Sequence, residues 1–337
     1  MDHLPPVLVR RLVLVPLALL ISLAFLALSP LLLALAAVID LVTPGNWRTL
    51  RLVAYLECYL VLEVIGLLAM FALWVWSGFG LKLRTPRLRD AHFGFMRWWL
   101  RVLDAVTRKL FRVRVKIEDR PTPTAGPILV FSRHAGPGNS MLLIGTLLVG
   151  YGRRPRIVML AKLQWEPLFD VMLNRLPNRF IQHDRTKRDL FRNAIGELAT
   201  GLGDMDAFVL FPEGKDFTPK LRLSGIERLR RAGHTRHADK AESLKRVLPP
   251  RHGGVMAAIT NAPDADVVFV AHALLEEVGS FKDVWRRIPL ENPIVSRYWR
   301  IPAAEVPREQ DALIEWLFHW WAQIDDWIAL RTSARPS

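Results

Sequence analysis

The chain of 337 residues has a single cysteine, Cys58, and this scarcity excludes two kinds of architecture. One cysteine cannot form an intramolecular disulfide, and it cannot supply a zinc site of the cysteine type. The sequence also lacks an internal repeat and a low-complexity tract. A metal site formed by His183, Asp184 and His272 has little support from their spacing. We therefore expect neither a metal nor a bound cofactor.

Apolar residues are abundant, at 51% of the chain, and the mean hydropathy is positive. Two apolar stretches explain this bias, Leu12 to Val38 and Leu52 to Trp76, and a short turn-like connector joins them into a predicted helical hairpin. The first stretch is too long for the apolar core of a signal peptide, so we interpret it as a retained anchor. Glu57 and Glu63 are costly in lipid, so the second helix lies shallow or faces protein, and an interfacial hairpin remains an alternative.

Positive charge is the dominant sign, with a net charge of +14 that gathers in two segments. Residues 79–120 hold twelve Lys or Arg against four acids, with aromatic residues between them, and residues 220–251 hold ten against three. The first segment follows the hairpin, so anionic lipid headgroups are favoured over nucleic acid as its partner. Basic flanks on both sides of the hairpin predict a cell-membrane protein whose remaining domain lies on the cytoplasmic side.

Beyond the hairpin, strand-like and helix-like segments alternate, which predicts an α/β fold with a mostly parallel central sheet flanked by helices. The expected domains are a membrane hairpin (1–78), a basic amphipathic linker with the first strand (79–120), a main domain (121–330) and a tail (331–337). The expected strands are Val113–Glu118, Pro127–Ser132, Arg156–Ala161, Arg179–Gln182, Ala207–Phe211, Asp266–His272 and Ile294–Ile301. The expected helices include Ser140–Val149, Pro167–Leu176, Lys187–Leu202, Gly225–Ala232 and Arg308–Leu330.

The last of these helices carries one broad apolar face rich in tryptophan. We favour packing of this face on the sheet, and a second membrane contact through interfacial tryptophan is the alternative.

His134 lies where the strand over 127–132 ends and the helix over 140–149 is about to begin. A histidine that removes a proton from a substrate hydroxyl must be neutral and held in one tautomer. A carboxylate on its other ring nitrogen holds the tautomer and stabilises the imidazolium that forms. The stretch Ser132 to Ser140 resembles the first motif of the glycerolipid acyltransferases, in which a His is followed after four residues by an Asp. Asn139 holds the Asp position here.

Three further segments are similar to later motifs of that family, in the family's order. Asn178 to Arg185 resembles the second motif, Phe211-Pro212-Glu213-Gly214 matches the core of the third, and Val267 to His272 resembles the fourth. Lys162 lies in a segment similar to one that follows the first motif. Each motif falls near the end of an expected strand, where α/β sheets place their ligands.

The resemblance implies transfer of a fatty acyl group from acyl-CoA or an acyl-carrier protein to a lysophospholipid, foremost 1-acylglycerol 3-phosphate, which gives phosphatidic acid. His134 is then the general base, with Asn139 at the orienting position, and no acyl-enzyme is required. The third motif, Phe211 to Gly214, would bind the acceptor through Glu213 and Gly214. The acceptor's phosphate would meet Lys162, Arg185 and Lys215. Backbone N–H groups of the turn that contains Gly136 and Gly138 would stabilise the anionic intermediate.

Two departures from the family pattern keep alternatives open. Asn139 carries no charge, so one alternative is a catalytically weak or silent lipid-binding protein. The third motif commonly continues with Thr-Arg, whereas this chain has Lys215-Asp216, and an acid at this place opposes an anionic ligand. The other alternative is therefore an acyltransferase with a different acceptor, such as a glycolipid or an aminoacyl lipid.

Overall fold

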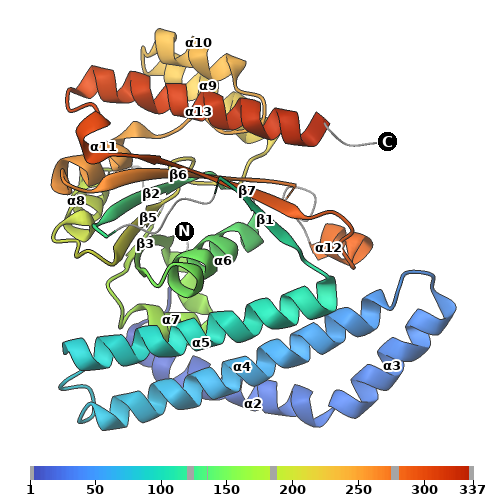
Figure 1. The fold of residues 1–337 in the computed structure, drawn as a ribbon. Helices are drawn as coiled ribbons and strands as arrows, with labels where there is room; N and C mark the ends of the chain where they lie inside the picture. The colour runs from blue at the N-terminus through green and yellow to red at the C-terminus, as the bar shows by residue number, and fades with distance from the viewer. Residues whose placement is uncertain (1–3, 120–124, 135, 183–187, 275–280, 334–337) are drawn as a thin grey trace. The chain divides into compact units, whose positions relative to one another are not determined.

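The computed structural model describes residues 4–119, 125–134, 136–182, 188–274 and 281–333 (Figure 1). The chain divides into two compact units, and each is built from several separate segments. The first unit comprises residues 1–114, 159–184 and 280–291, and the second comprises residues 115–158, 185–279 and 292–337. Residues 159–184, which the sequence assigned to the main domain, thus belong to the same unit as the N-terminal hairpin.

The first apolar stretch forms a broken helix rather than one straight helix. A continuous helical run begins with α1 (Val7–Val9) and η1 (Arg10–Leu14) and ends with α2 (Val15–Ala27), and α3 (Ser29–Val42) follows after Leu28. Pro30 lies in the first turn of α3. Proline has no N–H to donate and its ring clashes with the preceding turn, so the break lies where a proline is tolerated.

Two helical runs are long and apolar enough to cross a membrane, Val7–Ala27 and α4 (Arg48–Trp76). Large apolar side chains are exposed along α2 and α3, among them Leu20, Phe25 and Leu31. Exposed apolar surface of this extent is typical of a membrane-binding face. Together these features indicate association of this unit with a membrane.

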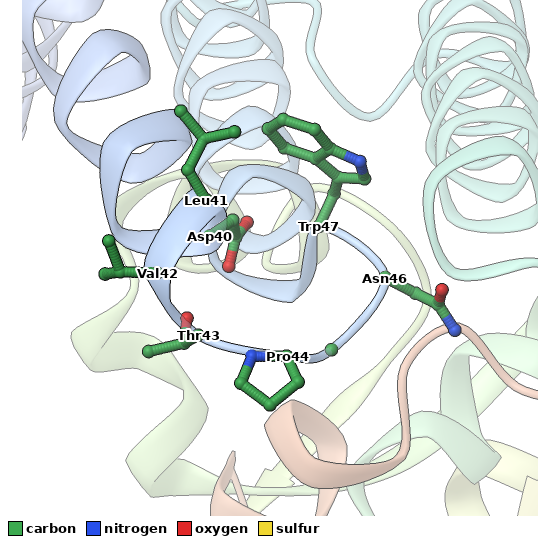
Figure 2. Close-up of a pocket in the computed structure, with 8 residues that line it drawn as sticks. Asp40, Leu41, Val42, Thr43, Pro44, Asn46 and Trp47 are labelled. Atoms are coloured by element: carbon green, nitrogen blue, oxygen red, sulfur yellow. The ribbon is translucent and has the colours of Figure 1, made fainter.

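The connector between α3 and α4 forms an open hollow lined by residues 40–47 (Figure 2). Asp40 caps the N-terminus of α4, because its two carboxylate oxygens accept hydrogen bonds from the N–H groups of Thr49 and Leu50, at 3.1 and 2.8 Å. A carboxylate at a helix N-terminus satisfies donors that the helix itself cannot pair. The geometry of the turn between α3 and α4 therefore explains this hollow.

Glu63 of α4 faces protein, which was one of the two alternatives for the second apolar helix. Its side chain is buried and accepts a hydrogen bond of 3.2 Å from the N–H of Leu168, in α7 (Pro167–Leu173). Gly66 lies one turn further along α4, where a Cβ atom would come within 2.5 Å of the Leu168 side chain. The absence of a side chain at Gly66 thus lets α4 and α7 approach closely.

The basic segment after the hairpin forms α5 (Pro86–Phe111), an amphipathic helix whose apolar face is buried within the unit. Phe93, Trp99 and Leu100 are buried, and α5 packs along α4 (Figure 1). α12 (Phe281–Arg287) completes the unit, and Arg48 donates a hydrogen bond of 3.1 Å to the carbonyl of Ile288 just after it.

A seven-stranded sheet in the order β1-β7-β6-β2-β5-β3-β4 confirms the predicted α/β class. Neighbours β1–β7, β2–β6, β2–β5 and β3–β5 pair in parallel, and β6–β7 pair antiparallel. Each of the seven expected strands is present. Their bounds are β1 (Val115–Glu118), β2 (Ile128–Ser132), β3 (Arg154–Leu160), β4 (Arg179–Ile181), β5 (Asp206–Leu210), β6 (Asp266–Ala273) and β7 (Ile294–Ile301).

The last helix, α13 (Gln310–Ser333), packs on the sheet, as the favoured interpretation predicted (Figure 1). Phe269 of β6 stacks on Trp320 and meets the edge of Trp321, with ring centroids 5.2 and 6.1 Å apart. The sequence missed two helices, one over residues 235–243, within the second basic segment, and one over residues 252–261, directly after it. The other elements are α6 (Pro137–Gly145), η2 (Thr146–Gly150), η3 (Ala161–Trp165), α8 (Arg188–Ala199), α9 (Pro219–Arg231), α10 (Thr235–Ser243), α11 (His252–Asn261) and η6 (Ala303–Glu305).

Candidate active site

The candidate site lies where β2 and β5, neighbours at the middle of the sheet, reach their carboxyl ends. Their parallel register pairs Phe131 with Leu210, so the loops that follow leave the sheet side by side. His134 follows β2 and Phe211 follows β5, and their rings lie 4.8 Å apart at a tilt of 40°. The two segments that resemble the first and third motifs therefore meet within the second unit.

A carboxylate faces the ring of His134, and it belongs to Asp216. Its Oδ1 lies 2.6 Å from Nδ1 of His134, within the distance of an ion pair. The same oxygen accepts a hydrogen bond of 2.8 Å from the N–H of Gly136. The His134 side chain is 23% exposed and that of Asp216 is 52% exposed, so the pair lies at the surface of the site.

Asn139 does not occupy the orienting position that the motif assigned to it. Its side chain is 0% exposed, and its Nδ2 donates a hydrogen bond of 2.5 Å to the carbonyl of Arg133. Among the described residues, its Oδ1 has no hydrogen-bond partner. Asn139 stands in the first turn of α6, and its amide faces the backbone that leaves β2. The expected contact with the imidazole is therefore replaced by one with the main chain.

Arg133, which the sequence analysis did not single out, is buried beneath the site. Its guanidinium donates hydrogen bonds to the carbonyl of His272 in β6, at 3.0 Å, and to the carbonyl of Arg246, at 2.8 Å. An arginine beside a catalytic-type histidine would ordinarily be expected to face an anionic ligand. Here its hydrogen bonds join the end of β2 to a neighbouring strand and to the segment that precedes α11.

Glu213 is also buried, and it accepts a hydrogen bond of 3.3 Å from the N–H of Leu248. Burial raises the pKa of Glu213 to about 8, although the charge of Arg133 and the backbone N–H groups of Leu248 and His134 act in the opposite direction. At neutral pH this carboxyl is mostly protonated. A buried, neutral acid held by the backbone stabilises the loop after β5.

The turn after β5 depends on Gly214, whose φ of 70° favours glycine. Its N–H donates to the carbonyl of Phe211, and Pro212 accepts a hydrogen bond of 3.0 Å from the N–H of Arg251. A Cβ atom at Gly214 would lie 3.3 Å from the guanidinium carbon of Arg251. Phe211, Pro212, Glu213 and Gly214 thus form one compact turn beside His134.

Cationic side chains near the site differ from the expected set. Lys215 is exposed in the loop that carries Asp216, and exposed Arg251 lies against Gly214. Lys162 is exposed on η3 and belongs to the first unit. Arg185 lies outside the described residues. The structure therefore brings Lys215 and Arg251 to the loops around His134, and Arg251 was not among the predicted phosphate ligands.

The glycine-containing turn before α6 has two different parts. Gly136 has a φ of 104°, and its N–H is engaged by Asp216. Gly138 is exposed in the first turn of α6, where helix N–H groups have no partner within the helix. The N–H of Gly136 is thus already engaged by a carboxylate.

His272 is unsuited to proton transfer, because burial and the charge of Arg133 lower its pKa to about 3. No cluster of potential metal ligands is present among the described residues.

No protein-family model and no curated protein matches the sequence. Among solved structures, the chain is similar to the crystal structure of the 1-acyl-sn-glycerophosphate (LPA) acyltransferase PlsC from Thermotoga maritima, with 14% sequence identity and a TM-score of 0.48 over 81% of this chain and 99% of that chain.

Proposed function

We propose that the protein transfers a fatty acyl group from a thioester to the hydroxyl of a membrane lysolipid. The observation that carries the proposal is the pair formed by His134 and Asp216, 2.6 Å apart at the carboxyl end of the central strand β2. A partly exposed imidazole with a carboxylate on Nδ1 has the arrangement of a general base. The ordered motifs between Pro127 and Leu275 favour acyl transfer over other reactions that begin with such a base.

In the proposed reaction, Nε2 of His134 accepts the proton of the acceptor hydroxyl as the oxygen attacks the thioester carbonyl. The new carbon–oxygen bond forms, the carbon–sulfur bond breaks, and the leaving thiolate takes the proton back from the imidazolium. The N–H of Gly138, at the start of α6, is the donor we propose for the negative charge that develops on the carbonyl oxygen. The thioester is already activated, so no covalent enzyme intermediate is needed.

For the acceptor, we propose a lysophospholipid, with 1-acylglycerol 3-phosphate as the first candidate and acyl-CoA or acyl-carrier protein as donor. Lys215 and Arg251 lie at the loops around His134 and supply positive charge for a phosphate. Lys162 and Arg185 stay candidates for the same role. Asp216 offered a reason to prefer a different acceptor, such as a glycolipid or an aminoacyl lipid, but its carboxylate faces His134 and Gly136. That reason is accordingly weaker.

The apolar helices of the first unit favour a membrane-bound acceptor, and we propose the cytoplasmic face of the cell membrane as the place of reaction. Both thioester donors are soluble molecules of that compartment.

The test is an acyl-transfer assay with purified protein, an acyl thioester and a panel of lysolipids. We expect His134→Ala to lower turnover by about 10²- to 10⁴-fold, the usual contribution of a general base. His319→Ala is the matched control, because His319 is exposed on α13 and its ring contacts Gln323. Equal turnover in wild type and His134→Ala would refute the mechanism.

A further inference from the structure

We propose that Asp216 is the residue that positions His134, and that it takes the role which the family's first motif gives to an aspartate at the place of Asn139. The inference rests on the proposed function and deepens it. The chain is then a competent enzyme whose supporting carboxylate comes from the loop after β5 rather than from the first turn of α6.

The first argument is the contact itself. One carboxylate oxygen of Asp216 lies 2.6 Å from Nδ1 of His134 and accepts the N–H of Gly136 at 2.8 Å. The backbone bond fixes the oxygen, so the imidazole meets an acceptor that is already in place. With the proton held on Nδ1, the lone pair of Nε2 is free to receive the proton of a hydroxyl. The negative charge also stabilises the imidazolium that forms during transfer.

The second argument is that both ends of the loop are held. On one side, Pro212 accepts a hydrogen bond from the N–H of Arg251, and Gly214 closes the turn after β5. On the other side, Thr218 caps α9 and accepts a hydrogen bond of 3.2 Å from the N–H of Leu221. Only a few residues separate these two anchors, so Asp216 is held near the end of β2. A positioning group requires such support.

The third argument is that Asn139 suits its own position and a carboxylate would not. Its Nδ2 donates to the carbonyl of Arg133 in a fully buried place. An ionised aspartate could not donate this bond, and its charge would face a carbonyl oxygen in a fully buried place. The Nδ2 group of Asn139 therefore matches the carbonyl that it meets, and the carboxylate of Asp216 matches the N–H of Gly136.

The test compares Asp216→Asn, Asp216→Glu and Asp216→Ala with wild type in the acyl-transfer assay. Asparagine keeps the size and an acceptor for Gly136 but removes the charge, so we expect kcat to fall by about 10²- to 10⁴-fold with KM changed less than about threefold. We expect Asp216→Glu to recover part of the loss, and added formate to restore part of the activity of Asp216→Ala. Asp189→Asn, at an exposed carboxylate on α8, is the matched control.

A structural role would give different results. If Asp216 acts through His134, then Asp216→Asn lowers turnover no further in a His134→Ala background. Independent, multiplying losses in the double variant would overturn the proposal, as would a kcat of wild-type size in Asp216→Asn. Loss of activity that follows loss of thermal stability, with no recovery by formate or by Asp216→Glu, would overturn it too.

A second measurement does not depend on activity. In protein labelled with ¹⁵N-histidine, the ring nitrogen shifts of His134, assigned by comparison with His134→Ala, report which nitrogen carries the proton. We expect the proton on Nδ1 in the wild type and a larger share on Nε2 in Asp216→Ala. Identical shifts in the two proteins would overturn the positioning role. An inactive wild type with the expected shifts would refute the proposed function alone.

Discussion

Asn139→Asp recreates the His-x4-Asp motif, and we expect it to damage the protein rather than improve it. The Asn139 side chain is 0% exposed and its Nδ2 bonds the carbonyl of Arg133 at 2.5 Å. Leaving a buried polar group without its partner costs about 1–3 kcal/mol. An ionised carboxylate in that place adds to this cost, so the new acid is expected to hold its proton well above its usual pKa.

Thermal unfolding measures this effect. For a domain of about 150–250 residues, 1 kcal/mol corresponds to about 2–4 °C in Tm, so the expected loss is at least about 2 °C and grows as pH rises and the acid ionises. Asn261→Asp is the matched control, because Asn261 also donates to a backbone carbonyl, that of Ala257, but from an exposed position on α11. A variant with unchanged Tm at pH 8 and higher turnover than wild type would show that the reasoning about Asn139 is wrong.

Two further predictions concern the buried groups beneath the site. The pKa of Glu213 is raised from 4.5 to about 8 in the folded protein, so its contribution to stability is fully present below pH 4.5 and is lost as pH rises through 8. In that window the free energy of unfolding of the wild type should fall by up to about 1.4 kcal/mol per pH unit. The free energy of unfolding of Glu213→Gln should not show this fall. Thermal unfolding between pH 5 and 8.5 checks this, and parallel curves for the two proteins would contradict it. Arg133→Met removes the hydrogen bonds to the carbonyls of His272 and Arg246, and we expect it to lower the free energy of unfolding in urea by about 1.5–3 kcal/mol. The control Arg231→Met, at an exposed arginine, should lower it by less than about 0.5 kcal/mol. Equal losses in the two variants would refute the role assigned to Arg133.

The strands could be predicted because each is a short apolar run between turn residues. Val130 and Phe131 of β2, for example, are 0% exposed, as a central parallel strand requires. His134 could be placed at the end of β2 for the same reason. The contact of His134 with Phe211 could not be predicted, because it depends on the adjacency of β2 and β5 in the sheet.

The partner of His134 could not be predicted, because Asp216 is far from it in the chain. The sequence presents Asp216 as an exposed acid beside Lys215, and an acid there reads as unfavourable to an anionic ligand. The contact depends on how the loop between β5 and α9 turns, which no local pattern specifies. The signal that could have found it was the coincidence of two substitutions, an amide where the first motif has an acid and an acid where the third has a base.

The break at Leu28 and the hydrogen-bond partner of Glu63 were also not predicted from the sequence. Pro30 was visible in the first apolar stretch, yet apolar composition alone gave no reason to divide it. Glu63 read as a residue that lipid would reject, and its actual partner is the N–H of Leu168, more than a hundred residues later. Local hydropathy indicates that a charged side chain is unfavourable in lipid, but its actual position and partner depend on the tertiary structure.

The discontinuous make-up of the first unit has a consequence for how the chain is assembled during synthesis. Its N-terminal helices are synthesised first. The N–H of Leu168 in α7, which bonds Glu63, and the carbonyl of Ile288, which accepts a hydrogen bond from Arg48, are synthesised much later. Until those segments are made, α4 presents an uncovered carboxylate and the bonding groups of Arg48 lack this partner. The apolar helices are therefore synthesised before these polar contacts can form, and the unit is completed only after residues 280–291 have been made.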